Sequence, residues 1–353
     1  MPELRRVIAG TLVALASSIL CLYVLTRLGS GRAVVASLLS VHPLYLLVSL
    51  ALVVVSWALE ALKMTVLIDA LGERLQYRTS LKIALIGGFA AGITPFDTGG
   101  EPVQVYLLHR EGIALGDCTA VVAVKGLSGA LARLCLGISI AVWFFVAKVS
   151  WSLPPTLNAV LTAGILVYAA LLLMFWYFTA RPEQIGTLAR RAGASRFARR
   201  FIGRRRLAQL ISSLEKTTTD FRVGVNTFAR EKRRHLALVA LLSLASWLLV
   251  LFVPVLLLRG LDVRSPVAHV LLTALIFYLA AAYAPTPGSS GAAELGFAAL
   301  FGRIVPLHLL GVFVLIWRFI TYYSTMFLGG LLVAREVSMK GRRKDDSDKI
   351  QHP

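Results

Sequence analysis

The chain has 353 residues, of which 57% are hydrophobic and only 16% are charged, with a mean hydropathy of +0.75 and a formal net charge of +19. Soluble domains carry about 25% charged residues, so this composition excludes an ordinary soluble fold and indicates an integral membrane protein. The three cysteines show neither a CxxC nor a Cys/His spacing, and we expect no metal site, no disulfide framework and no cofactor.

Apolar runs along the chain predict an all-α polytopic membrane protein. The first run, 7–25, follows Arg5 and Arg6 and is predicted to be a retained helix rather than a signal peptide, because it is long and lacks a small-residue cleavage site. Basic residues are enriched on the cytoplasmic side of membrane proteins, so we predict a multi-pass protein of the cell membrane with both termini in the cytoplasm. Five further full spans are predicted, at 44–71, 118–147, 157–179, 236–258 and 307–333.

Two apolar stretches, 83–108 and 267–302, are each interrupted by Pro and Gly and have arms too short to cross a bilayer. Irregular backbone at membrane depth is tolerated where protein buries it or where it lines a polar cavity. We therefore predict two re-entrant helical hairpins beside six full spans. An eight-span count, in which the hairpin arms cross fully, satisfies the same charge bias.

A strongly basic segment, 181–234, carries 15 Lys and Arg against 4 Asp and Glu. In so apolar a chain, this charge predicts a cytoplasmic segment whose amphipathic helices lie on anionic headgroups. No nucleic-acid partner is expected, because no binding motif accompanies the charge. Residues 1–340 are predicted to form one membrane domain, followed by a disordered tail at 341–353.

An internal repeat relates the two halves of the chain, with one unit at about 44–147 and the other at about 236–333. A shift of 193 residues superposes the two breaks and the two long spans of each unit. The first hairpin is predicted to enter from the inside and the second from the outside. Inverted repeats of this kind build transporters around discontinuous helices that meet near the bilayer midplane.

Each predicted hairpin has a glutamate just past its break, 24 positions before a basic residue. Glu101 precedes Lys125, and Glu294 precedes Arg318. A carboxylate in the first turn of a half-helix is favoured by the helix dipole and caps N–H groups. A charge at membrane depth also marks a pathway, a proton site or an ion-pair partner. Both interpretations of the two glutamates stay open.

Two arginines, Arg133 and Arg318, are predicted near mid-depth, where neither reaches water easily. Lys125 shares a helix face with Arg133. These basic residues are expected either to form buried ion pairs with Glu101, Glu294 or Glu60, or to bind an anionic phosphate headgroup, which guanidinium groups hold bidentately. The turns before the half-helices offer backbone N–H groups to the same anion, although Asp97 adds a negative charge there. These turn residues are Thr98, Gly99, Gly100, Ser289, Ser290 and Gly291.

Two motifs carry a family resemblance: TPFDTGGEPVQVYLLHREG (94–112) and PTPGSSGAAE (285–294). They resemble the flippase-like membrane domain of lysylphosphatidylglycerol synthases, which stand-alone UPF0104-type membrane proteins share, over about residues 5–335. The resemblance implies two re-entrant hairpins and movement of a lipid between leaflets. Family members often have Arg where this chain has Asp97 and Gln104. The synthases add a soluble aminoacyl-transferase domain, for which this chain leaves no room, so we expect no lipid aminoacylation.

Together these features predict a lipid flippase or lipid-linked transporter rather than an enzyme. Its expected partners are membrane lipids, namely an anionic or aminoacylated phospholipid, and a homodimer or an envelope-biosynthesis enzyme is compatible with the sequence. Two alternatives remain. One is an intramembrane lipid-modifying enzyme with a glutamate as base, and the other is a non-transporting membrane partner of a lipid or cell-envelope enzyme.

Overall fold

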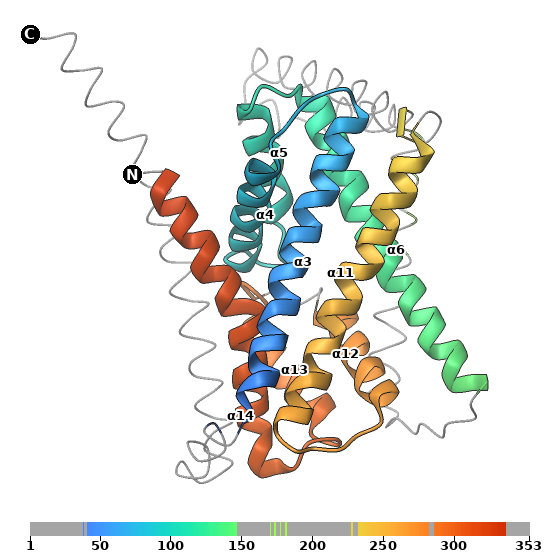
Figure 1. Cartoon of the computed structure of the whole chain (residues 1–353), viewed down its shortest axis with the longest axis vertical. Helices are drawn as coiled ribbons and strands as arrows, with labels where there is room; N and C mark the ends of the chain where they lie inside the picture. The colour runs from blue at the N-terminus through green and yellow to red at the C-terminus, as the bar shows by residue number, and fades with distance from the viewer. Residues whose placement is uncertain are drawn as a thin grey trace, which may run out of the picture.

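The computed structural model describes residues 41–146, 232–281 and 286–336, together with a few isolated positions outside these ranges (Figure 1). Within them, the regular structure is helical apart from one isolated β-bridge, which confirms the all-α fold class. Four predicted features lie wholly or mostly outside the described residues. They are the spans at 7–25 and 157–179, the basic segment 181–234 and the tail 341–353.

Four helices in the described ranges are long and apolar enough to cross a membrane. Their ends agree within a few residues with the four spans predicted there, because uninterrupted Leu, Val and Ala runs contain neither a polar turn nor a cap. Apart from a few charged residues, such as Lys63, Arg133 and Arg318, they are apolar around their whole circumference, as expected of helices surrounded by lipid or protein. These helices are α3 (Pro43–Ala70), α6 (Leu115–Val146), α11 (Arg233–Gly260) and the helix Leu307–Glu336.

The last of these helices changes its winding part of the way along. Its first part is α14 (Leu307–Arg318), and a π-helical turn, η1 (Phe319–Tyr323), follows directly before the α-helix resumes and continues to Glu336. A π turn inserts one extra residue into the helix and occurs frequently at functional sites. The irregularity therefore places Arg318 immediately before a backbone distortion.

Both interrupted stretches form helical hairpins. The first consists of α4 (Tyr77–Gly92) and α5 (Gly100–Arg110), and the second of α12 (Val267–Ala281) and α13 (Ala292–Phe301). At a rise of about 1.5 Å per residue, the arms are about 24, 17, 23 and 15 Å long, shorter than a hydrocarbon core of about 30 Å. The helix α4 begins at Tyr77, six residues before the apolar stretch 83–108, because no Pro or Gly in 77–82 breaks a helix.

The helices α3 and α11 run side by side in opposite directions through the centre of the molecule (Figure 1). The start of α3 lies beside the end of α11, where the backbone N–H of His42 donates to the carbonyl of Gly260 at 3.1 Å. The two hairpins pack at opposite ends of this pair, and their tips meet in an antiparallel bridge between Pro95 and Pro287. The breaks in the two halves of the chain are therefore neighbours in space.

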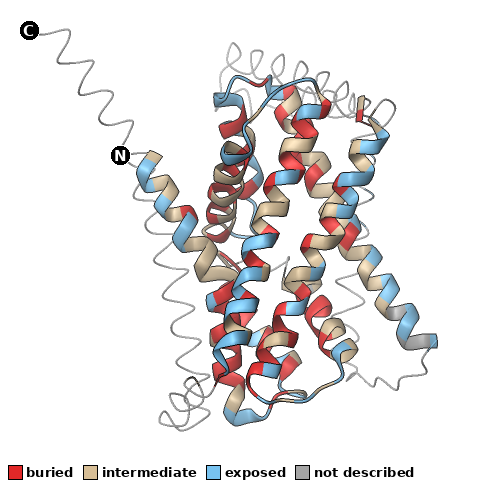
Figure 2. Ribbon diagram, viewed as in Figure 1, coloured by how far each residue is buried: buried red, intermediate tan, exposed pale blue. Residues whose placement is uncertain are grey.

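The hydrophobic core has two parts with different side chains. Around the second hairpin it is aromatic: the ring of Phe297 stacks on Trp317 with centroids 3.9 Å apart and contacts Phe301 and Phe313. Around the first hairpin it is mostly aliphatic. Buried residues concentrate along α13 and α14, whereas the far end of α6 is largely exposed (Figure 2).

Candidate functional site

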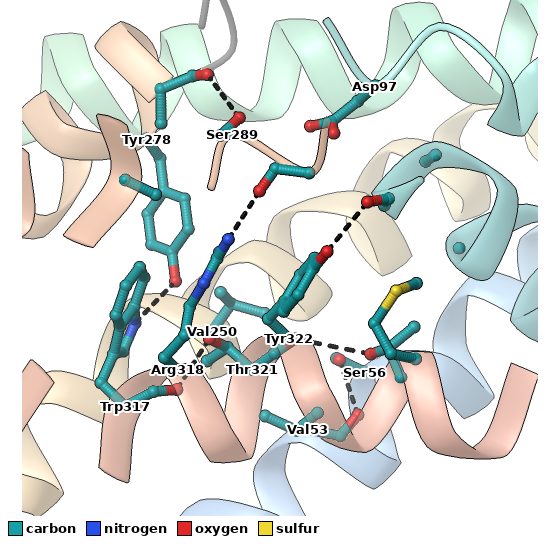
Figure 3. A pocket seen from close by; sticks show the side chains of 18 of the residues that line it. Val53, Ser56, Asp97, Val250, Tyr278, Ser289, Trp317, Arg318, Thr321 and Tyr322 are labelled. Carbon is teal, nitrogen blue, oxygen red and sulfur yellow. Dashed lines mark hydrogen bonds between the residues drawn. The ribbon is translucent and has the colours of Figure 1, made fainter. Parts of the chain in front are cut away.

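A cavity of about 330 Å³ lies between the tips of the two hairpins and is also lined by α3, α6, α11 and the last helix. Three charged side chains line it, namely Asp97, Arg133 and Arg318. Figure 3 shows Asp97 and Arg318. Most of its other polar lining comes from aromatic side chains and hydroxyl groups, which are Trp57, Trp247, Tyr278, Trp317, Tyr322, Ser56, Ser289, Thr321 and Thr325. The cavity therefore combines charge with apolar walls inside a bundle of apolar helices.

A buried ion pair anchors the second hairpin at this cavity. Nε of Arg318 donates to Oε1 of Glu294 at 2.9 Å, and Nη2 donates to the carbonyl oxygen of Gly288 at 2.6 Å. Glu294 is completely buried, and Arg318 is 5% exposed. The other carboxylate oxygen accepts the N–H of Gly291 at 2.6 Å and so caps α13. Glu294 thus caps a helix and orients a cation, the two roles left open by the sequence.

Tyr322 connects the two hairpins across the cavity. Its ring lies against the guanidinium group of Arg318, 3.8 Å from the ring centroid, in a cation–π contact. Its hydroxyl donates to the carbonyl oxygen of Gly92, the last residue of α4, at 2.9 Å (Figure 3). Tyr322 lies in the π turn, so the irregular winding of the last helix shapes this connection.

Arg133 approaches the cavity from α6, on a different helix from Arg318. Its guanidinium group lies over the ring of Trp247 of α11, 4.5 Å from the centroid. Asp97, at the tip of the first hairpin, is exposed and adopts a left-handed φ of 54°, a strained conformation for a residue with a side chain. The cavity is therefore bordered by two guanidinium groups and one carboxylate.

The turn residues predicted to bind an anion largely bond within their own hairpins. The N–H of Gly99 donates to Thr94 Oγ1 at 2.8 Å, and Gly291 donates to Glu294 as described. The hydroxyl of Ser290 accepts from Arg318 at 3.4 Å. Of the eleven residues predicted for the site, the cavity lining contains Arg133, Arg318 and Ser289, whereas the others lie outside it: Glu101, Glu294, Lys125, Thr98, Gly99, Gly100, Ser290 and Gly291.

The first hairpin does not repeat the ion pair of the second. Glu101 is exposed, and no ion pair joins it to Lys125 within 4 Å. Lys125 is 8% exposed and donates instead to Oε1 of Gln104 at 2.6 Å. Nearby, the buried Nζ of Lys63 contacts Oε1 of Glu60 at 2.6 Å, and the hydroxyl of Ser246 lies 3.3 Å from the same oxygen.

Several functional candidates were not identified from the sequence. Trp247, Tyr278 and Tyr322 line the cavity, and Gln104 takes the position expected of Glu101. Tyr322 could have been found from the sequence, because an aromatic residue four positions after Arg318 can stack on its guanidinium group. Trp247 and Tyr278 come from other helices and carry no such signal.

Two comparisons with known proteins bear on this site. The model of the family described as "Lysylphosphatidylglycerol synthase TM region" matches residues 7–329, which include both hairpins and the cavity between them. A UPF0104 membrane protein of Archaeoglobus fulgidus is 27% identical over 290 residues, which are 82% of this chain and 86% of that protein.

Proposed function

The chain belongs to the lysylphosphatidylglycerol synthase TM region family and is a multi-pass membrane protein, and on this premise we propose that it moves a phospholipid or a related anionic lipid between the two leaflets of a cell membrane. The observation that carries the proposal is the charged cavity between the hairpin tips. Ionisable side chains inside a membrane domain are costly to bury and mark pathways for polar groups.

The headgroup would occupy the cavity with its phosphate between the two arginines. Arg318, oriented by Glu294 and Gly288, and the half-buried Arg133, which lies over Trp247, would both contact the phosphate. Asp97 at the rim would repel a purely anionic group but would pair with an amine. This arrangement favours an aminoacylated or other amine-bearing phospholipid, and a cavity of about 330 Å³ is in the range of small-molecule sites.

The architecture supports transport by alternating access. Four hairpin arms too short to cross a bilayer would make two re-entrant hairpins, entering from opposite faces and meeting at the Pro95–Pro287 bridge. With six full spans, they would form an inverted repeat whose halves rock around the cavity. Both termini and the basic segment would then be cytoplasmic.

Reconstitution tests the proposal directly. Purified protein in vesicles of phosphatidylethanolamine and phosphatidylglycerol should accelerate the movement of a fluorescent phosphatidylglycerol or lysyl-phosphatidylglycerol to the outer leaflet. Arg133→Gln should slow this movement by about 10- to 100-fold, the size expected for losing a charge-assisted hydrogen bond of about 1.5–3 kcal/mol. Arg259→Gln, an exposed arginine outside the cavity lining, is the matched control and should retain the wild-type rate.

Two results would contradict the proposal. If Arg133→Gln and Arg318→Lys both keep the wild-type rate while folding normally, the cavity is not the headgroup site. If mass spectrometry of the same vesicles finds a chemically altered lipid, the protein acts as a lipid-modifying enzyme instead.

A further inference from the structure

An apolar groove adjoins the polar cavity at the π turn. It has a volume of about 520 Å³ and is lined by Phe89 of α4 and by six residues of the last helix, Phe319, Tyr322, Tyr323, Ser324, Met326 and Phe327. Two of these residues, Tyr322 and Met326, also line the polar cavity. Tyr322 and Met326 therefore separate the polar cavity, which contains charged side chains, from a groove lined mainly by aromatic side chains.

The groove opens on the apolar surface of the last helix. Phe319 and Phe327 at its edge are 62% and 72% exposed. The helix that carries them is long and apolar enough to cross a membrane, so the exposed rings are expected to face hydrocarbon. The groove thus offers an opening from the lipid phase towards the cavity.

The wall between groove and cavity is built for close backbone approach. Glycines of α4 face the last helix, with Gly88 opposite Thr325 and Gly92 opposite Met326, and a Cβ at either glycine would crowd its neighbour. The π turn interrupts the regular bonding of the last helix at the same level. The bond from Tyr322 to the Gly92 carbonyl crosses this wall. The wall therefore consists of small α4 residues packed against an irregular stretch of the last helix, with one hydrogen bond across it.

We propose that this groove is the binding site for a hydrocarbon chain of the transported lipid, and that Tyr322 and Met326 form the gate through which its headgroup enters the cavity. The proposal rests on the proposed function and names the occupant of the groove as the acyl chain of the same lipid molecule. The headgroup crosses in the polar cavity, while the acyl chain stays in contact with the bilayer through the groove. The glycerol region would lie beside Tyr322, where polar and apolar walls meet.

Photolabelling tests the groove without relying on transport. The probe is a phosphatidylglycerol with a diazirine in its acyl chain, in vesicles of phosphatidylethanolamine and phosphatidylglycerol that contain the full-length protein. Labels mapped by mass spectrometry should fall on Phe89, Tyr322 and Met326. Met326→Trp, which fills the gate, should remove the labels at Phe89 and Tyr322 and slow translocation at least tenfold. Leu328→Trp places the same ring outside the groove lining and should change neither.

The outcomes separate this inference from the proposed function. Labels confined to exposed positions such as Leu328 and Leu331, or equal behaviour of Met326→Trp and Leu328→Trp, would overturn the groove assignment even if the wild-type protein translocates lipid. Labels in the groove of a wild-type protein that translocates nothing would instead contradict the proposed function and leave the groove as a lipid-binding site.

Discussion

The two hairpins share a sequence pattern but not its chemistry. In the second hairpin, Glu294 is buried, caps α13 and pairs with Arg318, and the neighbouring Trp317 stacks on Phe297. In the first, Glu101 is exposed and Lys125 bonds to the neutral Gln104. We interpret the second hairpin as a rigid anchor for the cavity and the first as the adaptable side, where glycines contact the last helix. Matching spacing therefore does not imply matching roles.

The difference arises from which face of each short helix is buried. In α5 the buried positions are Gly100, Gln104, Leu107 and Leu108, a helical stripe that leaves out Glu101. In α13 the buried positions are Ala293, Glu294, Phe297, Ala298 and Phe301, a stripe that includes the glutamate. The rotation of the helix, rather than the depth of the carboxylate, decides whether an ion pair forms.

The largest expected effect comes from breaking the buried pair. Glu294→Gln should destabilise the protein by about 3–5 kcal/mol, because it leaves the buried guanidinium group of Arg318 without its carboxylate. Thermal unfolding in detergent micelles measures the loss. Glu101→Gln is the matched change in the first hairpin and should have no measurable effect, since Glu101 is exposed. Equal losses for the two variants would contradict the asymmetry between the hairpins.

A somewhat smaller effect is expected at the junction of the tips. Gly288 has a φ of +57°, and a Cβ there would overlap the Gly92 carbonyl and the Tyr322 hydroxyl. Gly288→Ala should therefore cost about 2–3 kcal/mol through backbone strain and overpacking. Gly112→Ala, at φ +97° but with open space around it, should cost about 1 kcal/mol. Chemical unfolding of both variants in micelles measures the difference, and a larger loss at Gly112 would refute the account of the tips.

Removing the cation of the first hairpin should matter less than removing that of the second. Lys125→Met leaves the carbonyl of Gln104 without its donor but also removes a buried charge, so the loss should be about 1–2 kcal/mol. Arg318→Met strands the Glu294 carboxylate and should cost about 3–5 kcal/mol. The same unfolding assay compares them. A Lys125→Met loss as large as that of Arg318→Met would show that both hairpins depend on a buried cation.

The smallest effect is expected where the last helix meets the first hairpin at the surface. Glu336 pairs with Lys82 at 3.4 Å and with Arg110 at 3.1 Å, and all three side chains are partly exposed. Glu336→Gln should cost less than about 1 kcal/mol, and the difference from wild type should shrink in high salt because ions screen exposed pairs. Unfolding at low and high ionic strength measures it. A large loss that salt leaves unchanged would show that this contact is structural.

Much of the described fold was predictable from the sequence, because Pro and Gly interruptions and apolar runs set helix ends directly. The pairing of Glu294 with Arg318 follows from their spacing of 24 residues together with their burial. The spacing of 24 residues predicts how deep each side chain lies but not which way each helix is rotated. It therefore did not reveal that Lys125 bonds to Gln104 instead of Glu101. Tyr322 lies in a π turn, and no local sequence pattern predicts such a turn.

The central claim, that the cavity between the hairpin tips holds a lipid headgroup, is tested most directly by native mass spectrometry of the protein purified in mild detergent. The wild-type protein should retain a phospholipid. Arg133→Gln should lose it, and Arg259→Gln, with an equal change of charge outside the cavity lining, should keep it. Equal lipid retention by all three proteins would contradict the claim.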